Sequence, residues 1–233
     1  MGYLKVDYNN TIGVGCDGAE SLGEGLRQTV EASRSFFRRL ADEIPGLVIE
    51  NCSSGGHRLE PSMMELASMA SFSDAHECRS IPIIAANLHR LIRSEQSQIW
   101  AVIRAADDVH RIRCSMCAGF LGRICLSGDI DNISDEQMNE ISGALDFYGR
   151  VKDIIRSGFT SVIRCTSVSC EQPEGYQAVL RKYGNRAILV VHTFENGANP
   201  PIDDLLHGMN IVEAWGSELS GDFRARAFLL ESR

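Results

Sequence analysis

No stretch of this sequence approaches the ~20 consecutive apolar residues that a membrane-spanning helix needs. The first 20 residues also lack the charged start and apolar centre of a secretory signal peptide. Long basic runs are missing as well, since the longest is Arg38-Arg39 and the formal net charge is −8. We therefore expect a cytoplasmic protein whose partners are neither nucleic acids nor membranes.

Motifs for binding a metal or a cofactor are also missing. The six histidines show neither an H-x-x-x-H nor an H-E-x-x-H spacing. The glycine-rich segments 13–18 and 53–56 have no lysine at the spacing of a phosphate-binding loop. Of the eight cysteines, Cys114 and Cys117 have the spacing of half a zinc site, but no second pair follows at finger or ribbon distance. We expect these thiols to be reduced and packed in a helix, and we expect no metal and no cofactor.

Short apolar runs alternate with stretches of helical periodicity through the first two thirds of the chain. The composition, 44% hydrophobic and 23% charged, is that of an ordinary globular protein. This alternation predicts parallel βα units. Strands are expected at 2–10, 47–51, 70–74, 98–103 and 124–126, and helices at 20–44, 60–69, 81–93, 107–122 and 134–157.

The pattern changes after Gly158. Five β-rich segments follow, separated by Gly, Pro and Asn turns, at 161–169, 176–183, 186–193, 210–215 and 223–230. They predict a small antiparallel domain. We therefore expect an α/β protein with a βα domain at 1–158 and an antiparallel, sandwich-like β-domain at 159–233.

Polar residues follow the first three predicted strands. Lys5 and Asp7 lie two residues apart, so they face the same side of the first strand. The second strand runs into the segment Asn51-Cys-Ser-Ser-Gly-Gly56, and the third ends at Asp74. The chemistry of parallel βα folds lies at the carboxyl ends of the strands. This placement favours a catalytic site, with an incidental ion pair at a solvated strand end as the alternative for Lys5 and Asp7.

Asp7 and Asp74 are the two carboxylates of this candidate site. Two carboxylates about 5–5.5 Å apart define a retaining glycosidase, in which one is the nucleophile and the other the general acid/base. Lys5 is expected to favour the ionised form of Asp7. An apolar setting that includes Met69 and Phe72 is expected to keep Asp74 protonated.

The motifs combine in an order and spacing that resemble glycoside hydrolase family 36, the bacterial α-galactosidases. The motifs are Leu4-Lys-Val-Asp-Tyr-Asn9, Glu50-Asn-Cys-Ser-Ser-Gly-Gly56, Ser73-Asp74, the segment 121–129 and Phe147-Tyr148. The resemblance covers residues 1 to about 158 well and the C-terminal sheet only loosely. It implies a partial (β/α)8 TIM barrel, holding strands four to eight, followed by a small antiparallel β-domain.

The resemblance also implies an activity, the hydrolysis of terminal α-D-galactosyl residues of oligosaccharides with retention and without a metal. By the same resemblance Asp7 is the nucleophile and Asp74 the acid/base. The implied contacts to the galactosyl group are Lys5, Asn9, Cys52 and the backbone around Gly55. Glycine suits such a contact because backbone without a side chain approaches a sugar closely.

The sequence departs from the family pattern in three places. Val6 stands where the family commonly has Trp, and Ala75 stands where a second acidic residue often follows the catalytic one. An intact barrel typically needs about 250 residues, whereas about 130 precede Ser134 here. We therefore expect a truncated or split reading frame, with two exposed strand edges that pair with another chain or aggregate.

Three alternatives to an α-galactosidase stay open. The same scaffold suits an α-N-acetylgalactosaminidase or a raffinose-type galactosyl transferase. The chain also fits an inactive remnant that lacks the first half of the barrel. A homo-oligomer is a further open possibility.

Overall fold

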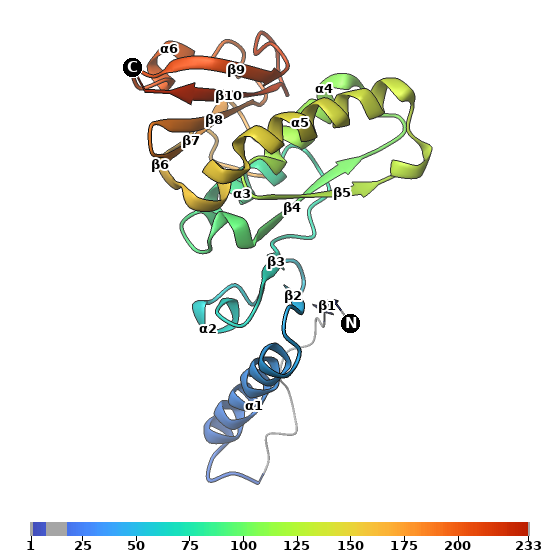
Figure 1. Ribbon diagram of the computed structural model, residues 1–233, viewed down its shortest axis with the longest axis vertical. Coiled ribbons are helices and arrows are strands. Elements are labelled where there is room, and N and C mark those ends of the chain that lie inside the picture. Colours follow the sequence, from blue (N-terminus) through green and yellow to red (C-terminus); the bar gives the residue numbers. More distant parts are fainter. Residues whose placement is uncertain (1, 8–17, 233) are drawn as a thin grey trace. The chain divides into compact units, whose positions relative to one another are not determined.

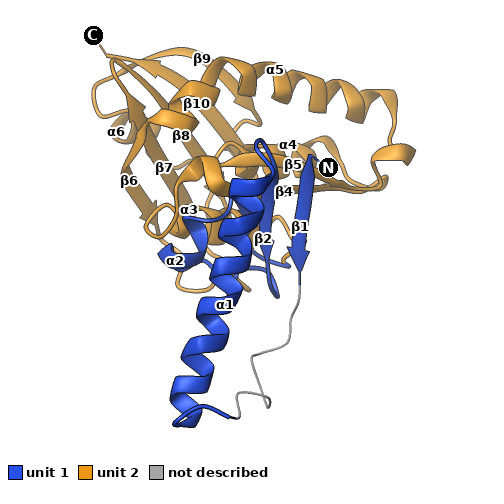
Figure 2. Cartoon of the chain, turned by 60° about the horizontal axis from the view of Figure 1, so that its bottom comes forward, with its two compact units in different colours: residues 1–74 blue, residues 75–233 orange. Residues whose placement is uncertain are grey.

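The computed structural model describes residues 2–7 and 18–232, which form two compact units that divide at residue 74 (Figure 1). Figure 2 colours residues 1–74 blue and residues 75–233 orange. Among the helices of the described residues, none combines the length and the apolar character that crossing a membrane requires.

Three parallel strands form the sheet of the first unit, with β2 in the middle and β1 at the edge. The strands are β1 (Tyr3–Asp7), β2 (Val48–Cys52) and β3 (Met69–Ser71). In the register of β1 and β2, Lys5 is aligned with Glu50 and Asp7 with Cys52. Residues aligned in this way face the same side of the sheet.

The helix of the first unit is α1 (Leu22–Glu43), which begins at Ser21, whose hydroxyl accepts a hydrogen bond from the backbone N–H of Glu24. Its second half packs on the apolar side of the strands. The core there consists of Phe37, Leu47, Ile49 and Met63, with Leu4, Val6, Leu40, Ile44 and Leu66 packed against it. Because side chains alternate along a strand, burying this side leaves Lys5, Asp7 and Glu50 on the opposite side, whereas Asn51 shares the buried side with Ile49 and Val6.

Two expectations for this unit need correction. The predicted helix 60–69 is reduced to α2 (Pro61–Met64), because the chain joins β2 at Ser68, whose backbone N–H donates to the carbonyl oxygen of Ile49. The strand predicted at 70–74 spans only Met69–Ser71. The apolar side of α1 is also buried only in its second half, since Leu22 is 76% and Leu26 44% exposed.

The second unit begins with two further parallel strands, β4 (Ser97–Ile103) and β5 (Arg123–Gly128). They are connected by α4 (Val109–Gly119), which packs on β4. A 3₁₀ turn, η1 (Ser94–Gln96), precedes β4, and α3 (Ile81–Leu88) is shorter than the helix predicted at 81–93. The described strands thus include five parallel ones, three in the first unit and two in the second, which agrees with part of a βα barrel.

The long helix α5 (Asp135–Ser157) follows the 3₁₀ turn η2 (Ile130–Asn132) and begins with the predicted capping box. The Ser134 hydroxyl accepts from the backbone N–H of Gln137, and the Gln137 side-chain oxygen accepts from the backbone N–H of Ser134, at 3.2 and 2.8 Å. The Gln137 amide nitrogen also donates to three carbonyl oxygens of the loop that follows β4. These bonds fix the start of α5 at the carboxyl end of β4.

An antiparallel sheet of five strands completes the second unit, in the order β6-β7-β8-β10-β9. The strands are β6 (Phe159–Cys165), β7 (Tyr176–Tyr183), β8 (Arg186–Thr193), β9 (Asn210–Gly216) and β10 (Ala225–Glu231). One side of this sheet packs on α6 (Ile202–Leu205) and its neighbouring loops. The change to antiparallel strands after Gly158 confirms the pattern read from the sequence.

The other side of the antiparallel sheet packs on the helices of the second unit, so both sides are buried (Figure 1). Polar side chains on this side form hydrogen bonds with backbone carbonyl oxygens of the helices. Gln177 donates to Pro82 at 2.9 Å, a ring nitrogen of His192 lies 3.3 Å from the carbonyl oxygen of Cys114, and Arg181 donates to the end of α5. The antiparallel sheet therefore forms one compact unit with residues 75–158. The predicted domain boundary at residue 158 stays a prediction.

We expect the Ser134→Ala substitution to destabilise the protein by about 1 kcal/mol, because it leaves the N–H of Gln137 without its capping hydroxyl. Ser134→Asp, which keeps an accepting oxygen, is expected to cost much less. Urea unfolding followed by circular dichroism measures both values. Equal losses in the two variants would contradict the capping role.

Candidate active site

The polar side of the first sheet gathers the residues that the sequence singled out. The aligned pairs Lys5–Glu50 and Asp7–Cys52 place all four side chains on the side opposite α1. Asp7 and Cys52 stand at the carboxyl ends of their strands. The register of β1 and β2 therefore brings these four side chains together.

Glu50 is the buried charge at the centre of this side, with 4% of its surface exposed. Its carboxylate accepts hydrogen bonds from the hydroxyls of Tyr3 on β1 and Ser71 on β3. The ammonium group of Lys5 lies 3.6 Å from the same carboxylate. A buried carboxylate without such partners would be strongly unfavourable, so these contacts join the three strands.

Cys52 lies beside both charged residues of β1. Burial raises the pKa of the Cys52 thiol, the charge of Lys5 and a hydrogen bond with Ser71 lower it, and the charge and hydrogen bonding of Asp7 raise it. The thiol is 3% exposed, whereas the Asp7 side chain is exposed to solvent. The thiol is therefore neutral at pH 7, and on this side of the strand pair Asp7 and Lys5 are exposed to solvent.

The loop after β2 lies against the backbone that carries Asp74. Ser54, Gly55 and Gly56 all have positive φ angles, 40°, 61° and 123°. A Cβ atom added to Gly55 would lie 2.1 Å from the backbone nitrogen of Asp74, and one added to Gly56 would lie 2.5 Å from the carbonyl oxygen of Phe72. The two glycines are required because the loop passes this close to residues 72–74.

The structure therefore brings the predicted residues into two groups. Lys5, Asp7 and Cys52 lie together on the polar side of β1 and β2, and Gly55 lies against Asp74. Asn9 lies outside the described residues.

The setting of Asp74 differs from the expectation. Met69 and Phe72 are buried, at 6% and 3% exposure, but Asp74 itself is exposed. The end of the strand explains this difference, because β3 ends at Ser71 and the chain leaves the sheet before Asp74. Within the described residues, the apolar enclosure expected for a protonated acid is not formed.

Glu50, Ser71 and Tyr3 are the residues of this site that sequence reasoning missed. A signal was present, since Glu50 is a charged residue inside the apolar run Leu47–Asn51. A carboxylate there requires a buried partner. The partner could not be identified without the register that aligns Glu50 with Lys5.

Metal binding receives no support from the described residues, in which no group of three or more His, Cys, Asp or Glu side chains is arranged to hold an ion. Cys114 and Cys117 are buried within α4, as the helical pattern predicted.

No family model matches the sequence. No curated protein sequence matches it either. Solved structures do match, and several are α-galactosidases of glycoside hydrolase family 36. The enzyme AgaA of Geobacillus stearothermophilus, solved with 1-deoxygalactonojirimycin, gives a TM-score of 0.80 at 14% identity over 99% of this chain and 35% of that one.

Two further structures extend the comparison. The α-galactosidase of Lactobacillus brevis gives a TM-score of 0.79 at 14% identity, over 100% of this chain and 36% of that one. An Anoxybacillus α-amylase gives a TM-score of 0.51 at 7% identity, over 86% and 56%. The chain thus has the fold of about a third of a family 36 α-galactosidase, as the sequence resemblance predicted.

Gly55→Ala is expected to destabilise the first unit far more than Gly46→Ala. Both glycines have positive φ, but a Cβ at Gly46 meets nothing within 4 Å, whereas one at Gly55 meets the backbone of Asp74. The backbone conformation alone costs about 1 kcal/mol, and the clash adds at least ~2 kcal/mol. Urea unfolding gives the two values, and hydrogen exchange at residues 72–74 should accelerate in Gly55→Ala only. Equal effects of the two substitutions would contradict the close approach.

Asp7→Asn is expected to lower the pKa of the Cys52 thiol. The Asp7 charge disfavours a neighbouring thiolate, so its removal makes the thiolate easier to form. The Cβ resonance of ¹³C-labelled cysteine, followed against pH and assigned with Cys52→Ser, measures the shift. Cys165, whose pKa is also raised by burial, serves as the internal control and should not move. An unchanged Cys52 titration would show that Asp7 does not face the thiol.

Proposed function

We propose that this chain carries the two catalytic carboxylates of a retaining α-galactosidase that acts on terminal α-D-galactosyl residues of oligosaccharides. The observation that supports the proposal is the polar side of β1 and β2, where Asp7 stands exposed at a strand end beside the ion pair between the exposed Lys5 and the buried Glu50. It occurs in a fold shared with family 36 α-galactosidases.

In the first step, a carboxylate oxygen of Asp7 attacks the anomeric carbon of the galactosyl group. Asp74 donates its proton to the glycosidic oxygen, so the leaving sugar departs as a neutral alcohol. The product of this step is a covalent galactosyl ester of Asp7 and an ionised Asp74.

In the second step, Asp74 removes a proton from a water molecule that attacks the same carbon from the side that the leaving sugar vacated. The ester bond to Asp7 breaks, and galactose is released with its original anomeric configuration. Asp74 again carries the proton, so both carboxyl groups return to their starting states.

The ion pair with Glu50 positions the ammonium group of Lys5 to donate a hydrogen bond to a sugar hydroxyl. Glu50 in turn is fixed by Tyr3 and Ser71, so the ammonium group is positioned by three strands. Asn9, Cys52 and the backbone around Gly55 are the further proposed contacts to the galactosyl group. Glu50 thus acts through Lys5 and is a positioning residue.

Complexes of related structures support the substrate class. Variants of AgaA were solved with raffinose and with stachyose. The chain described here spans about 35% of AgaA, so the activity of a whole enzyme is part of the proposal. An α-N-acetylgalactosaminidase, a galactosyl transferase or a non-catalytic remnant are the alternatives on the same scaffold.

The proposal predicts that a galacto-configured cyclitol epoxide esterifies Asp7. The carboxylate opens the epoxide as it would attack the anomeric carbon, and peptide mass spectrometry locates the adduct. Asp7→Asn should abolish labelling, whereas Asp42→Asn, which removes an exposed carboxylate of α1, should leave it intact.

Each outcome of this experiment separates the alternatives. Labelling at another carboxylate would show that the nucleophile is wrongly assigned, and no labelling at all would favour the remnant. Faster labelling by the 2-acetamido epoxide than by the galacto epoxide would favour the N-acetylgalactosaminidase.

A further inference from the structure

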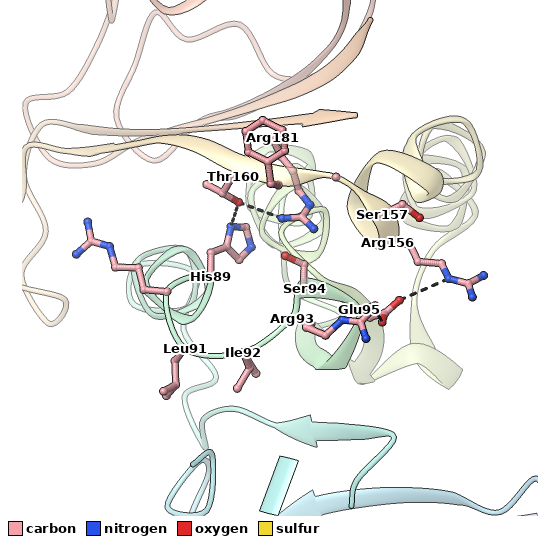
Figure 3. A pocket seen from close by; sticks show the side chains of 13 residues that line it. His89, Leu91, Ile92, Arg93, Ser94, Glu95, Arg156, Ser157, Thr160 and Arg181 are labelled. Atoms are coloured by element: carbon pink, nitrogen blue, oxygen red, sulfur yellow. Dashed lines mark hydrogen bonds and ion pairs between the residues drawn. The ribbon is translucent and has the colours of Figure 1, made fainter. Parts of the chain in front are cut away.

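A cavity of about 990 Å³ lies in the second unit, and none of the residues that line it belongs to the candidate active site. It is formed by residues 89–95, between the end of α3 and η1, by the carboxyl end of α5 with the start of β6, and by Arg181 of β7. Its size is that of sites that hold small molecules. Figure 3 shows the side chains that line it.

Positive charge is concentrated in this cavity. Four arginines line it and one carboxylate opposes them, that of Glu95, in a chain whose net charge is −8. Glu95 is shared between two arginines, since it pairs with Arg93 and lies 3.5 Å from Arg156. The cavity therefore keeps an excess of cations that the described carboxylates around it do not balance.

Arg181 is the most buried of these cations, with 8% of its surface exposed. Its hydrogen-bond partners in the described residues are neutral, and Glu95, which acts on it through its charge, is already paired with Arg93 and Arg156. Nε donates to the carbonyl oxygens of Ile154 and Ile155 at 3.1 and 3.0 Å, and Nη1 donates to the Thr160 hydroxyl at 3.2 Å. Carbonyl oxygens at a helix end attract a cation, but they do not neutralise it. Burial lowers the pKa of Arg181, as expected for a buried cation whose charge its surroundings do not fully neutralise.

Ser94 supplies the observation that points to a ligand. Its side chain is buried, at 2% exposure, and its hydroxyl has no hydrogen-bond partner among the described residues. Buried hydroxyl groups are nearly always paired in folded proteins. Ser94 lines the cavity, and Figure 3 shows it pointing toward Arg181 and His89. The Ser94 hydroxyl thus lies in the same cavity as a buried guanidinium group whose hydrogen-bond partners are neutral.

The neutral groups of the cavity fit the same ligand. Burial lowers the pKa of His89, so its ring is neutral at pH 7 and bonds the Thr160 hydroxyl and the carbonyl oxygen of Leu121, at 2.8 and 2.6 Å. Both ring nitrogens are therefore used, and His89 holds Thr160 in place. The free hydrogen-bonding capacity of the cavity consists of donors, from Ser94 and the arginines.

We propose that this cavity binds a phosphate group, free or carried on a small polar molecule, through Arg181, Ser94 and Arg156. A tetrahedral dianion accepts several hydrogen bonds at once, which matches a hydroxyl and guanidinium groups that converge from different elements. The alternative, a set of solvated arginines, accounts for the exposed Arg156 but leaves the buried Ser94 hydroxyl unexplained. The site does not depend on the proposed glycosidase activity.

Titration calorimetry of the 233-residue chain with inorganic phosphate tests the proposal, with chloride at equal ionic strength as the reference. Ser94→Ala is expected to weaken phosphate binding by about ten-fold. Ser97→Ala is the matched control, because Ser97 is equally buried and its hydroxyl also lacks a partner in the described residues, but it does not line the cavity. It should bind phosphate as the unchanged chain does.

The arginines provide a second pair of variants. Arg156→Gln removes an exposed lining cation and should weaken phosphate binding by about three- to ten-fold. Arg104→Gln removes a cation that follows the carboxyl end of β4 and does not line the cavity, so phosphate binding should be unchanged. Neither side chain is buried, so both variants should fold.

Other outcomes would overturn the proposal. Absence of phosphate binding beyond the chloride reference would do so, as would equal losses in Ser94→Ala and Ser97→Ala. Acetate binding as tightly as phosphate would show a general cationic surface rather than a phosphate site. Glycerol 3-phosphate binding more tightly than inorganic phosphate would support a carried phosphate group, and weaker binding would support the free ion.

Discussion

The buried carboxylate of Glu50 is the constraint on which the first unit depends. It lies on the middle one of three parallel strands, where an unpaired charge would be strongly unfavourable, and two groups of β1 and one of β3 satisfy it. A slip of one residue in β1 would move Lys5 to the α1 side, so the same charge also fixes the register. Asp7 is placed beside Cys52 because this register is fixed. The positions of Asp7 and Cys52 at the strand ends therefore depend on the Lys5–Glu50 ion pair two residues earlier on each strand.

The second constraint is the close approach of the loop at Gly55 and Gly56 to residues 72–74. β3 is only three residues long and its pairing with β2 ends at Ala70, so the sheet alone does not position Asp74. Contact with the backbone of Gly55 positions Asp74 beyond the end of the strand pairing. The glycines that the sequence suggested for sugar contact are therefore also required by the structure. A ligand would contact the loop only on the side that faces away from residues 72–74.

Much of this arrangement could be predicted from the sequence. Alternation placed Lys5 and Asp7 on one side of a strand, the capping box located the start of α5, and turn residues separated the antiparallel strands. What failed depends on partners distant in the sequence. The register made Glu50 the partner of Lys5, and the hydrogen bond from Ser68 to Ile49 ended the helix predicted at 60–69. Such contacts leave no periodic trace, so local patterns cannot reveal them.

Stability and chemistry are divided between the two units. In the second, an antiparallel sheet is buried on both sides, and Gln177, His192 and Arg181 bond the ends and carbonyl groups of the helices, so even its polar residues serve packing. In the first, one side of a small sheet is apolar and the other is charged. A charged side contributes little to a core, so we expect the first unit to be the less stable of the two. The residues proposed for catalysis therefore occupy the part of the chain that gains most from binding a substrate.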